Sequence, residues 1–447
     1  MSAGPAPSSA AQVAADLVAR TQRRAGRGWW ILFGLSSAAF AIGAGAVGYL
    51  VTTGIGVWGV NRGVAWAFDI TNFVFWIGIG HAGTLISAIL LLLRQEWRTG
   101  VHRAAEMMTI FAIVCAAIFP VIHLGRPWLL HWVLPLPNTR GPLWINFLSP
   151  LTWDVVAIST YFAVSALFCW LGLLPDLALM RDASGGRRRR VLAALCLGWD
   201  GSQRTWARHR EACVLVAALA TPLVISVHSV VSFDFAATLV PGWHTTIFPP
   251  YFVVGAIFSG MATVLVLAIV MRRAMALESV ITPGHLDAMG KVMLAASLLL
   301  GFAYFVELAE PLVSGHEAQR LLLLARTGGP LAWAFWTMLA CNALVPQLLW
   351  LPAVRRNAAA SLAIAATAVV GMWLERFVIV VGSLQRDALP ATWVGYLPTA
   401  FEVATLVGSV GLFLVLFLLF CRFLPVVAVS EAWGERARRE RGGEAGA

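Results

Sequence analysis

The sequence predicts an all-α integral membrane protein with ten transmembrane helices. Of its 447 residues, 59% are hydrophobic and only 12% are charged, whereas soluble domains carry about 25% charged residues. The mean hydropathy is +0.79. The 20 tryptophans suit a chain whose helices end at two membrane–water interfaces. These observations argue against a soluble globular protein.

Ten apolar runs reach the length of about 20 residues that a spanning helix needs. They cover residues 29–53, 69–93, 104–123, 151–174, 212–234, 250–271, 288–310, 330–352, 358–381 and 398–421. The polar segment before the first run is too long, and that run too extended, for a cleaved signal peptide. We therefore expect the first run to stay in the protein as a spanning helix.

The two halves of the chain resemble each other. Residues 149–153 open the fourth run as 329–333 open the eighth, and residues 123–127 end the third run as 307–311 end the seventh. We therefore expect two four-helix bundles of parallel topology, from spans 2–5 and 6–9, with two flanking helices. The expected divisions are 1–28 (cytoplasmic N-terminal segment), 29–68 (flanking span 1 and outer loop), 69–234 (first bundle), 235–382 (second bundle), 383–425 (span 10) and 426–447 (cytoplasmic tail).

The basic residues predict the orientation. Of 32 Lys and Arg residues, 25 lie at one end of the spans, six at the other, and Arg376 inside a span. The positive-inside rule places the arginine-rich end and both termini in the cytoplasm. This asymmetry accounts for the net charge of +10 without a nucleic-acid partner. We expect Arg187–Arg190 to form a solvated cytoplasmic loop, with contact to anionic lipid as the alternative.

The six cysteines are isolated, and no C-x-x-C motif occurs. This spacing argues against a disulfide framework, a structural zinc site and a cysteine-ligated iron–sulfur cluster. We therefore predict no metal-ligating residues in this chain.

Ionisable side chains gather at the outer ends of several spans. They are Asp69, His123, Asp154, Asp234, Glu307 and Arg376. Charged groups at such depths usually face a bundle interior. Histidine titrates near neutrality and a shielded carboxylate can approach it. His123 and Asp154 therefore suit a hydroquinone, which needs two hydrogen-bond partners and two proton acceptors.

Each of these residues also has a structural alternative. His123 would cap helix carbonyls, and Asp154 would favour the helix dipole in a first turn. Asp69 and Asp234 would be interface residues. Arg376 needs a partner inside the membrane, and we expect it to hold Asp154 or Asp234 ionised. Glu375 is expected to face another helix or the lipid headgroups.

His81 lies about 18 Å deeper than Asp69 if both belong to one helix. No other histidine is expected at this depth, which argues against haem ligation. A proton relay and a satisfied interior histidine remain as alternatives. Glu106, at the inner start of the third span, would join such a proton path together with Asp69, or would simply favour its helix N-terminus. Glu307 is the candidate for a second polar site, in the second bundle.

Several longer stretches resemble one membrane-protein family. They are residues 58–98, 103–128, 136–162, 173–182 and 226–236, within a resemblance that covers about residues 28 to 425. The chain resembles the NrfD/polysulfide-reductase-type membrane subunits, most closely the quinol-binding ActC type of bacterial alternative complex III. An arginine-rich insert after Asp182 departs from the family pattern and leaves its loop contacts open.

The resemblance implies ten spans and a menaquinol site near the periplasmic face. Its quinol-site residues would be His123, Asp154, Asp234 and Arg376. It also implies that this subunit has no haem or iron–sulfur ligands and lies in the bacterial inner membrane. The implied partners are a periplasmic iron–sulfur subunit, a second NrfD-type membrane subunit and multihaem cytochrome c subunits.

Three functions remain open from the sequence. The first is quinol oxidation within a quinol:cytochrome c or other acceptor oxidoreductase of a respiratory or photosynthetic chain, with protons released or translocated outward. The second is a secondary transporter with a midplane site, which parallel repeats and His81 allow. The third is a non-catalytic membrane anchor of a molybdopterin-type oxidoreductase.

Overall fold

The computed structural model describes residues 25–135 and 149–428. Within these ranges ten helical segments are long and apolar enough to cross a membrane, and no strand occurs. The segments are Arg27–Thr53, Phe68–Leu92, His102–His123, Pro150–Asp182, Gln203–Ala236, Phe248–Ala274, Pro283–Val313, Ala332–Trp350, Ala358–Gly382 and Ala400–Phe423. The prediction of a ten-span, all-α membrane protein is confirmed. Most of the predicted terminal segments 1–28 and 426–447 lies outside the described residues.

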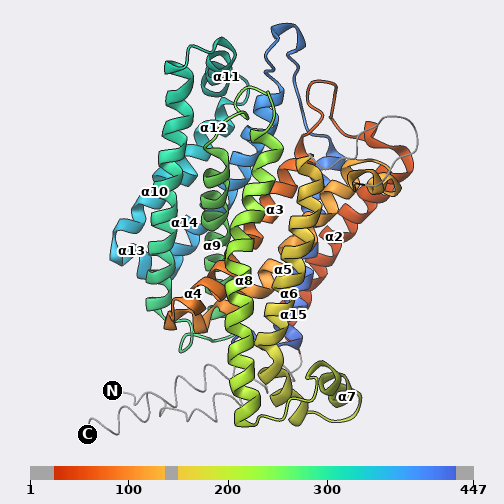
Figure 1. Cartoon of the computed structure of the whole chain (residues 1–447), viewed down its shortest axis with the longest axis vertical. Helices are drawn as coiled ribbons and strands as arrows, with labels where there is room; N and C mark the ends of the chain where they lie inside the picture. Colours follow the sequence, from red (N-terminus) through yellow and green to blue (C-terminus); the bar gives the residue numbers. More distant parts are fainter. Residues whose placement is uncertain (1–24, 136–148, 429–447) are drawn as a thin grey trace.

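Figure 1 labels the helices that make these spans. They are α2 (Arg27–Thr53), α3 (Phe68–Thr84), α4 (Leu90–Leu92), α5 (His102–His123), α6 (Pro150–Asp182), α8 (Gln203–Ala236), α9 (Phe248–Ala274), α10 (Pro283–Val313), α12 (Ala332–Leu339), α14 (Ala358–Phe377) and α15 (Ala400–Phe423). Three π-helical segments, at Leu85–Ile89, Ala340–Leu344 and Val378–Gly382, lie within spans. Such segments often occur at functional sites.

Local sequence signals set several helix starts. Pro150 occupies the first turn of α6, where its missing N–H leaves no backbone bond unmade. The Thr152 hydroxyl then donates to the Val133 carbonyl at 2.7 Å, which ties α6 to the segment that follows α5. At α15, Thr399 and Glu402 form a reciprocal capping box. The start of α6 matters most here, because it fixes Asp154 at one end of the molecule.

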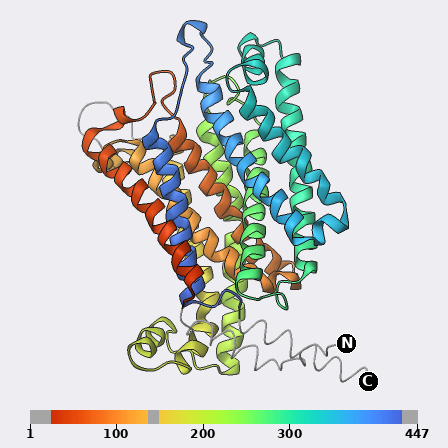
Figure 2. The ribbon, with the colours of Figure 1, turned by 180° about the vertical axis from the view of Figure 1, so that it is seen from behind.

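α3 lies at the centre of the molecule, and all of its residues are buried. It packs against α5, α8, α9 and α14, whereas α2 and α15 pack on each other and contact α5. Figure 2 shows α2 and α15 side by side, in red and blue, along one flank. α2 and α15 approach closely because Gly43 and Gly408 face each other, and a Cβ on Gly43 would overlap the Gly408 Cα. Small residues allow this kind of packing between membrane helices.

The remaining contacts are compatible with the expected pair of bundles. Each of α3, α5, α6 and α8 contacts two others of this group, and each of α9, α10, α12 and α14 contacts at least one other of its own group. Contacts of α9 with α3, α5 and α8, and of α14 with α3, join the two groups. The division into two four-helix bundles, and the domain limits drawn from it, remain predictions.

Two helices lie in segments that the sequence indicated as loops. α7 (Gly186–Leu195) contains the run expected to be a solvated loop, and α11 (Glu317–Gly328) connects α10 to α12. In addition, α6 and α8 each exceed 30 residues, more than a membrane requires. Their extensions carry α7 at one end of the molecule (Figure 1). We call this the arginine-rich end, and the opposite end, where α5 finishes at His123, the site end.

Candidate functional site

Asp69 and His123 form a hydrogen-bonded pair at the site end. Asp69 is in the first turn of α3 and His123 is the last residue of α5, and His123 Nδ1 meets Asp69 Oδ2. The Asp69 side chain is 1% exposed and that of His123 is 21% exposed. His123 therefore pairs with a carboxylate in place of the helix carbonyls that the structural alternative gave it. A carboxylate on Nδ1 fixes the imidazole so that Nε2 can serve a second partner.

Asp154 and Asp234 bring two carboxyl groups together at the same end. Asp154 lies near the start of α6 and Asp234 near the end of α8, and both side chains are buried. The two carboxyl groups lie close enough to share a hydrogen bond when one is protonated. Among the described residues no other side chain or backbone N–H donates to either Asp154 oxygen. Two carboxyl groups in contact cannot both ionise at low cost, so this pair is suited to holding one proton between its members.

An open cavity of about 570 Å³ adjoins this carboxyl pair. Its lining includes Asp234, Phe233, Trp153 and Trp66. Trp66 lies three residues before Asp69, but neither Asp69 nor His123 is part of this lining. A mostly apolar wall with a few polar groups, at a volume within about 300–1,000 Å³, is typical of small-molecule sites.

Arg376 has a different partner from the one expected. Its Nη1 lies 2.9 Å from Glu375 Oε1, and both side chains are almost fully buried. The guanidinium also lies over the Phe252 ring, 4.4 Å from its centroid, which is a cation–π arrangement. The expectation that Arg376 pairs with Asp154 or Asp234 is therefore wrong, because Glu375 of its own helix is buried beside it and is its partner.

Uncharged residues extend this buried pair. Tyr304 of α10 donates from its hydroxyl to Glu375 Oε2, and the Asn342 amide donates to the Tyr304 hydroxyl at 2.9 Å. Neither residue was singled out from the sequence, since a tyrosine or an asparagine in an apolar run has many structural roles. The structure offers a signal for these residues that the sequence lacks, because Asn342 belongs to one π-helical segment and Glu375 nearly adjoins another.

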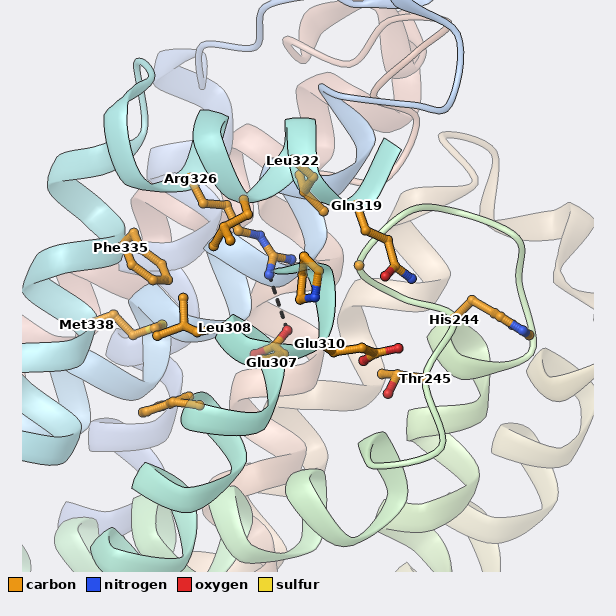
Figure 3. A pocket seen from close by; sticks show the side chains of 14 residues that line it. His244, Thr245, Glu307, Leu308, Glu310, Gln319, Leu322, Arg326, Phe335 and Met338 are labelled. Carbon is orange, nitrogen blue, oxygen red and sulfur yellow. Dashed lines mark hydrogen bonds and ion pairs between the residues drawn. The ribbon is translucent and has the colours of Figure 1, made fainter. Parts of the chain in front are cut away.

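Glu307, the predicted second polar site, pairs with Arg326. Arg326 Nη1 lies 3.2 Å from Glu307 Oε1, and Arg326 Nη2 donates to Ser383 at 3.0 Å. Figure 3 shows Arg326 reaching from α11 to Glu307 on α10, with Glu310 and Gln319 around the same cavity. The enclosed space is about 30 Å³, which accommodates a water molecule or two. Tyr304 also lines this cavity, so it connects Glu307 with the Glu375–Arg376 pair.

His81 has a histidine neighbour that the sequence analysis did not place at its depth. His228 of α8 packs edge-on against it with ring centroids 4.9 Å apart. Both are buried, and neither His81 nitrogen has a hydrogen-bond partner among the described residues. The expectation of a single mid-depth histidine is therefore wrong. Haem iron does not fit between these rings, because two metal–nitrogen bonds of about 2 Å each plus the half-widths of both rings exceed their separation.

Glu106 lies far from these groups, at the arginine-rich end. It accepts from Arg103 Nη1 at 3.0 Å, while Arg103 Nη2 donates to the Gly172 carbonyl at 2.6 Å and approaches Asp176 at 3.3 Å. Arg103 is only 1% exposed, although the sequence placed it outside the membrane. Glu106 thus belongs to a buried ion-pair cluster and does more than favour a helix N-terminus.

The predicted site residues therefore form separate contacts. The structure pairs Asp69 with His123 and Asp154 with Asp234, and it places Arg376 in the Glu375 network. A hydrogen bond connects the helices that carry Asp69 and Arg376. Trp373, one turn before Arg376, donates at 2.8 Å to Asn72, one turn after Asp69. Across the described ranges, no group of three or more His, Cys, Asp or Glu residues is arranged to hold a metal ion.

Comparison with known proteins gives the family. A family model described as polysulphide reductase, NrfD, matches residues 56–387. A putative membrane subunit of the dimethyl sulfoxide reductase of Halobacterium salinarum is 26% identical over 90% of this chain and 92% of its own. An Hdr-like menaquinol oxidoreductase integral membrane subunit of Archaeoglobus fulgidus is 22% identical over 68% of this chain and 67% of its own. A selenate reductase subunit of Mesobacillus selenatarsenatis is 20% identical over 45% of this chain and 47% of its own. Because the family model covers most of the chain, this multi-pass membrane protein belongs to the NrfD polysulphide reductase family.

Proposed function

We propose that this chain is the quinol-oxidising membrane subunit of an electron-transfer complex. The observation that carries the proposal is the presence of two acid–base contacts at the site end, Asp69–His123 and Asp154–Asp234, with an open cavity beside Asp234. Both contacts can take up a proton, and the cavity wall is mainly apolar, as a lipid-soluble substrate requires. The name of the Archaeoglobus relative makes menaquinol the substrate we favour.

Oxidation of a hydroquinone to a quinone releases two electrons and two protons. In the proposed reaction, His123 Nε2 accepts one hydroxyl proton while Asp69 stabilises the imidazolium that forms. The ionised member of the Asp154–Asp234 pair accepts the other proton. Both electrons leave to an acceptor in a partner subunit, for which the family resemblance suggests a periplasmic iron–sulfur protein. A second NrfD-type subunit and multihaem cytochromes c, as in alternative complex III, complete the proposed assembly.

The excess of Lys and Arg at the arginine-rich end supports a periplasmic site end and cytoplasmic termini, in the inner membrane of a bacterium. Protons given up at the site end would then enter the periplasm. The His81–His228 contact and the Arg103–Glu106 cluster both lie in the first group of helices (α3, α5, α6 and α8). We propose that these residues, together with Asp69, form a proton path. Glu307 and its cavity form the proposed polar site of the second group.

The test replaces one carboxyl group in the assembled complex. Asp154→Asn keeps the side-chain shape but removes a proton acceptor, so we expect quinol:acceptor turnover to fall by about 100-fold or more. Asp387→Asn, in an exposed loop at the same end, is the matched control and should keep full turnover. Full turnover in assembled Asp154→Asn complex would contradict the assignment and favour a membrane anchor. Substrate flux through proteoliposomes that contain the chain alone would instead favour a transporter.

A further inference from the structure

α7 combines a row of arginines with exposed aliphatic side chains. Leu192 and Cys196 face inward and are buried. Val191 and Leu195 lie one turn apart on a neighbouring face and are 60% and 44% exposed, and Leu197 just beyond the helix is 73% exposed. Arg187 precedes Val191 by one further turn, so charge and apolar surface follow each other along one stripe. Exposed aliphatic side chains beside a row of arginines are typical of helices that lie on a membrane surface.

A contact with α6 places the C-terminal end of α7 near the membrane surface. The Trp170 indole donates to the Leu195 carbonyl at 3.2 Å. About 20 helical residues cross the hydrocarbon core, so α6, which starts at Pro150, leaves that core near Trp170. Tryptophan is enriched at this interface. Figure 1 accordingly shows α7 beside the arginine-rich ends of α6 and α8.

Nearby acidic groups have local partners. Asp182 pairs with Arg181 at 2.8 Å, and Asp200 accepts from the Ser202 amide and the Thr205 hydroxyl. In the part of the chain that the structure describes, no ion pair involves Arg187, Arg189 or Arg190, and all three are exposed. Their positive charge is therefore exposed at the surface of α7.

We propose that α7 is an interfacial anchor that binds anionic phospholipid. Headgroup phosphates contact Arg187, Arg189 and Arg190, while Val191, Leu195 and Leu197 enter the boundary between headgroups and acyl chains. A basic helix with an apolar stripe binds membrane surfaces in this way, and the negative surface potential of the leaflet adds attraction for each arginine. This inference depends on the membrane position of α6 and does not depend on the proposed quinol chemistry.

The experiment measures hydrogen–deuterium exchange of the full chain in nanodiscs. Discs of phosphatidylcholine alone are compared with discs that also contain phosphatidylglycerol. We expect backbone exchange across residues 186–197 to be slower in the anionic discs, on the order of tenfold. The triple substitution Arg187→Gln, Arg189→Gln, Arg190→Gln should abolish this difference. Unchanged exchange in the middle of α8 would show that the triple variant is folded.

The matched control removes three exposed arginines from elsewhere at the same end. The triple substitution Arg94→Gln, Arg273→Gln, Arg356→Gln changes the net charge equally and should keep the lipid-dependent protection. Equal exchange in both kinds of disc would overturn the proposal, as would an equal loss in the control triple. Protection by soluble glycerol phosphate in phosphatidylcholine discs would also overturn it, because the site would then bind a free anion and not a lipid.

Discussion

The contact between Asp69 and His123 gives the two residues of the proposed site different roles. The buried carboxylate holds one imidazole nitrogen, and the ring remains partly exposed. In this arrangement Asp69 acts through His123 as a positioning residue. The two side chains should therefore behave as one functional unit.

A double-mutant cycle tests this unit. Asp69→Asn and His123→Gln should each lower turnover of the assembled complex, by about 100-fold for the histidine. The double variant should be no slower than His123→Gln alone, because residues that act together are strongly non-additive. The measurement is steady-state quinol oxidation with complex assembly checked for each variant. If the fold decrease in turnover of the double variant equals the product of the two single decreases, Asp69 and His123 act independently.

The sequence predicted these residues better than it predicted their partners. Depth along apolar runs brought Asp69, His123, Asp154 and Asp234 to one end, since rise per residue fixes depth in a spanning helix. It did not determine rotation about the helix axis. Glu375 and Arg376 are adjacent in sequence and both turn inward, which a pattern of depth cannot reveal. His228 was missed although rise per residue places it about 9 Å deeper than Asp234 of the same helix, because depth alone does not show which helix face meets His81.

At the scale of helices, apolar run length was sufficient to place all ten spans, because the hydrocarbon core sets the minimum length. It was not sufficient to place their ends. α6 and α8 continue well beyond the predicted 151–174 and 212–234, since helix hydrogen bonds persist in water when extensions pack together. α11 was missed because its apolar residues follow an amphipathic pattern too short for a span. Its Arg326 nonetheless completes the Glu307 pair.

The close contact between α2 and α15 predicts different effects for substitutions at two glycines of α2. Gly43→Ala should destabilise the protein by about 1–3 kcal/mol, because the added methyl group overlaps the Gly408 backbone. Gly45→Ala, two residues away with nothing within 4 Å of its built Cβ, should be neutral or slightly stabilising. Thermal unfolding of the detergent-purified chain measures both. Similar midpoints for the two variants would mean that α2 and α15 do not pack at this glycine.

At the scale of the whole molecule, the two groups of helices carry corresponding ion pairs. Arg103 of α5 pairs with Asp176 of α6 at 3.3 Å, and Asp287 of α10 pairs with Arg355 of α13 (Pro352–Arg356) at 2.9 Å. Arg103 and Asp287 are separated by the same 184 positions as His123 and Glu307, so the match supports the internal repeat with the charges exchanged. The site end differs more, because the first group has the two acid–base contacts and the second has the Glu307–Arg326 pair. Open cavities adjoin both groups, about 570 Å³ beside Asp234 and about 710 Å³ beside Glu310.

The proposed quinol site belongs to the first group of helices, and the proposed proton path runs through the interior of that group. His81 and His228 lie between the site end and the Arg103–Glu106 cluster, and no hydrogen-bond partner in the described residues accounts for the His81 nitrogens. If protons pass through this interior, His81→Gln should lower the number of protons translocated per electron while leaving quinol turnover within about twofold. The measurement is proton release by the complete complex in sealed proteoliposomes. His316→Gln, which changes an exposed histidine, is the control. An unchanged proton-to-electron ratio in His81→Gln would remove the imidazole pair from the path and leave proton release at the site end as the whole of the proton chemistry.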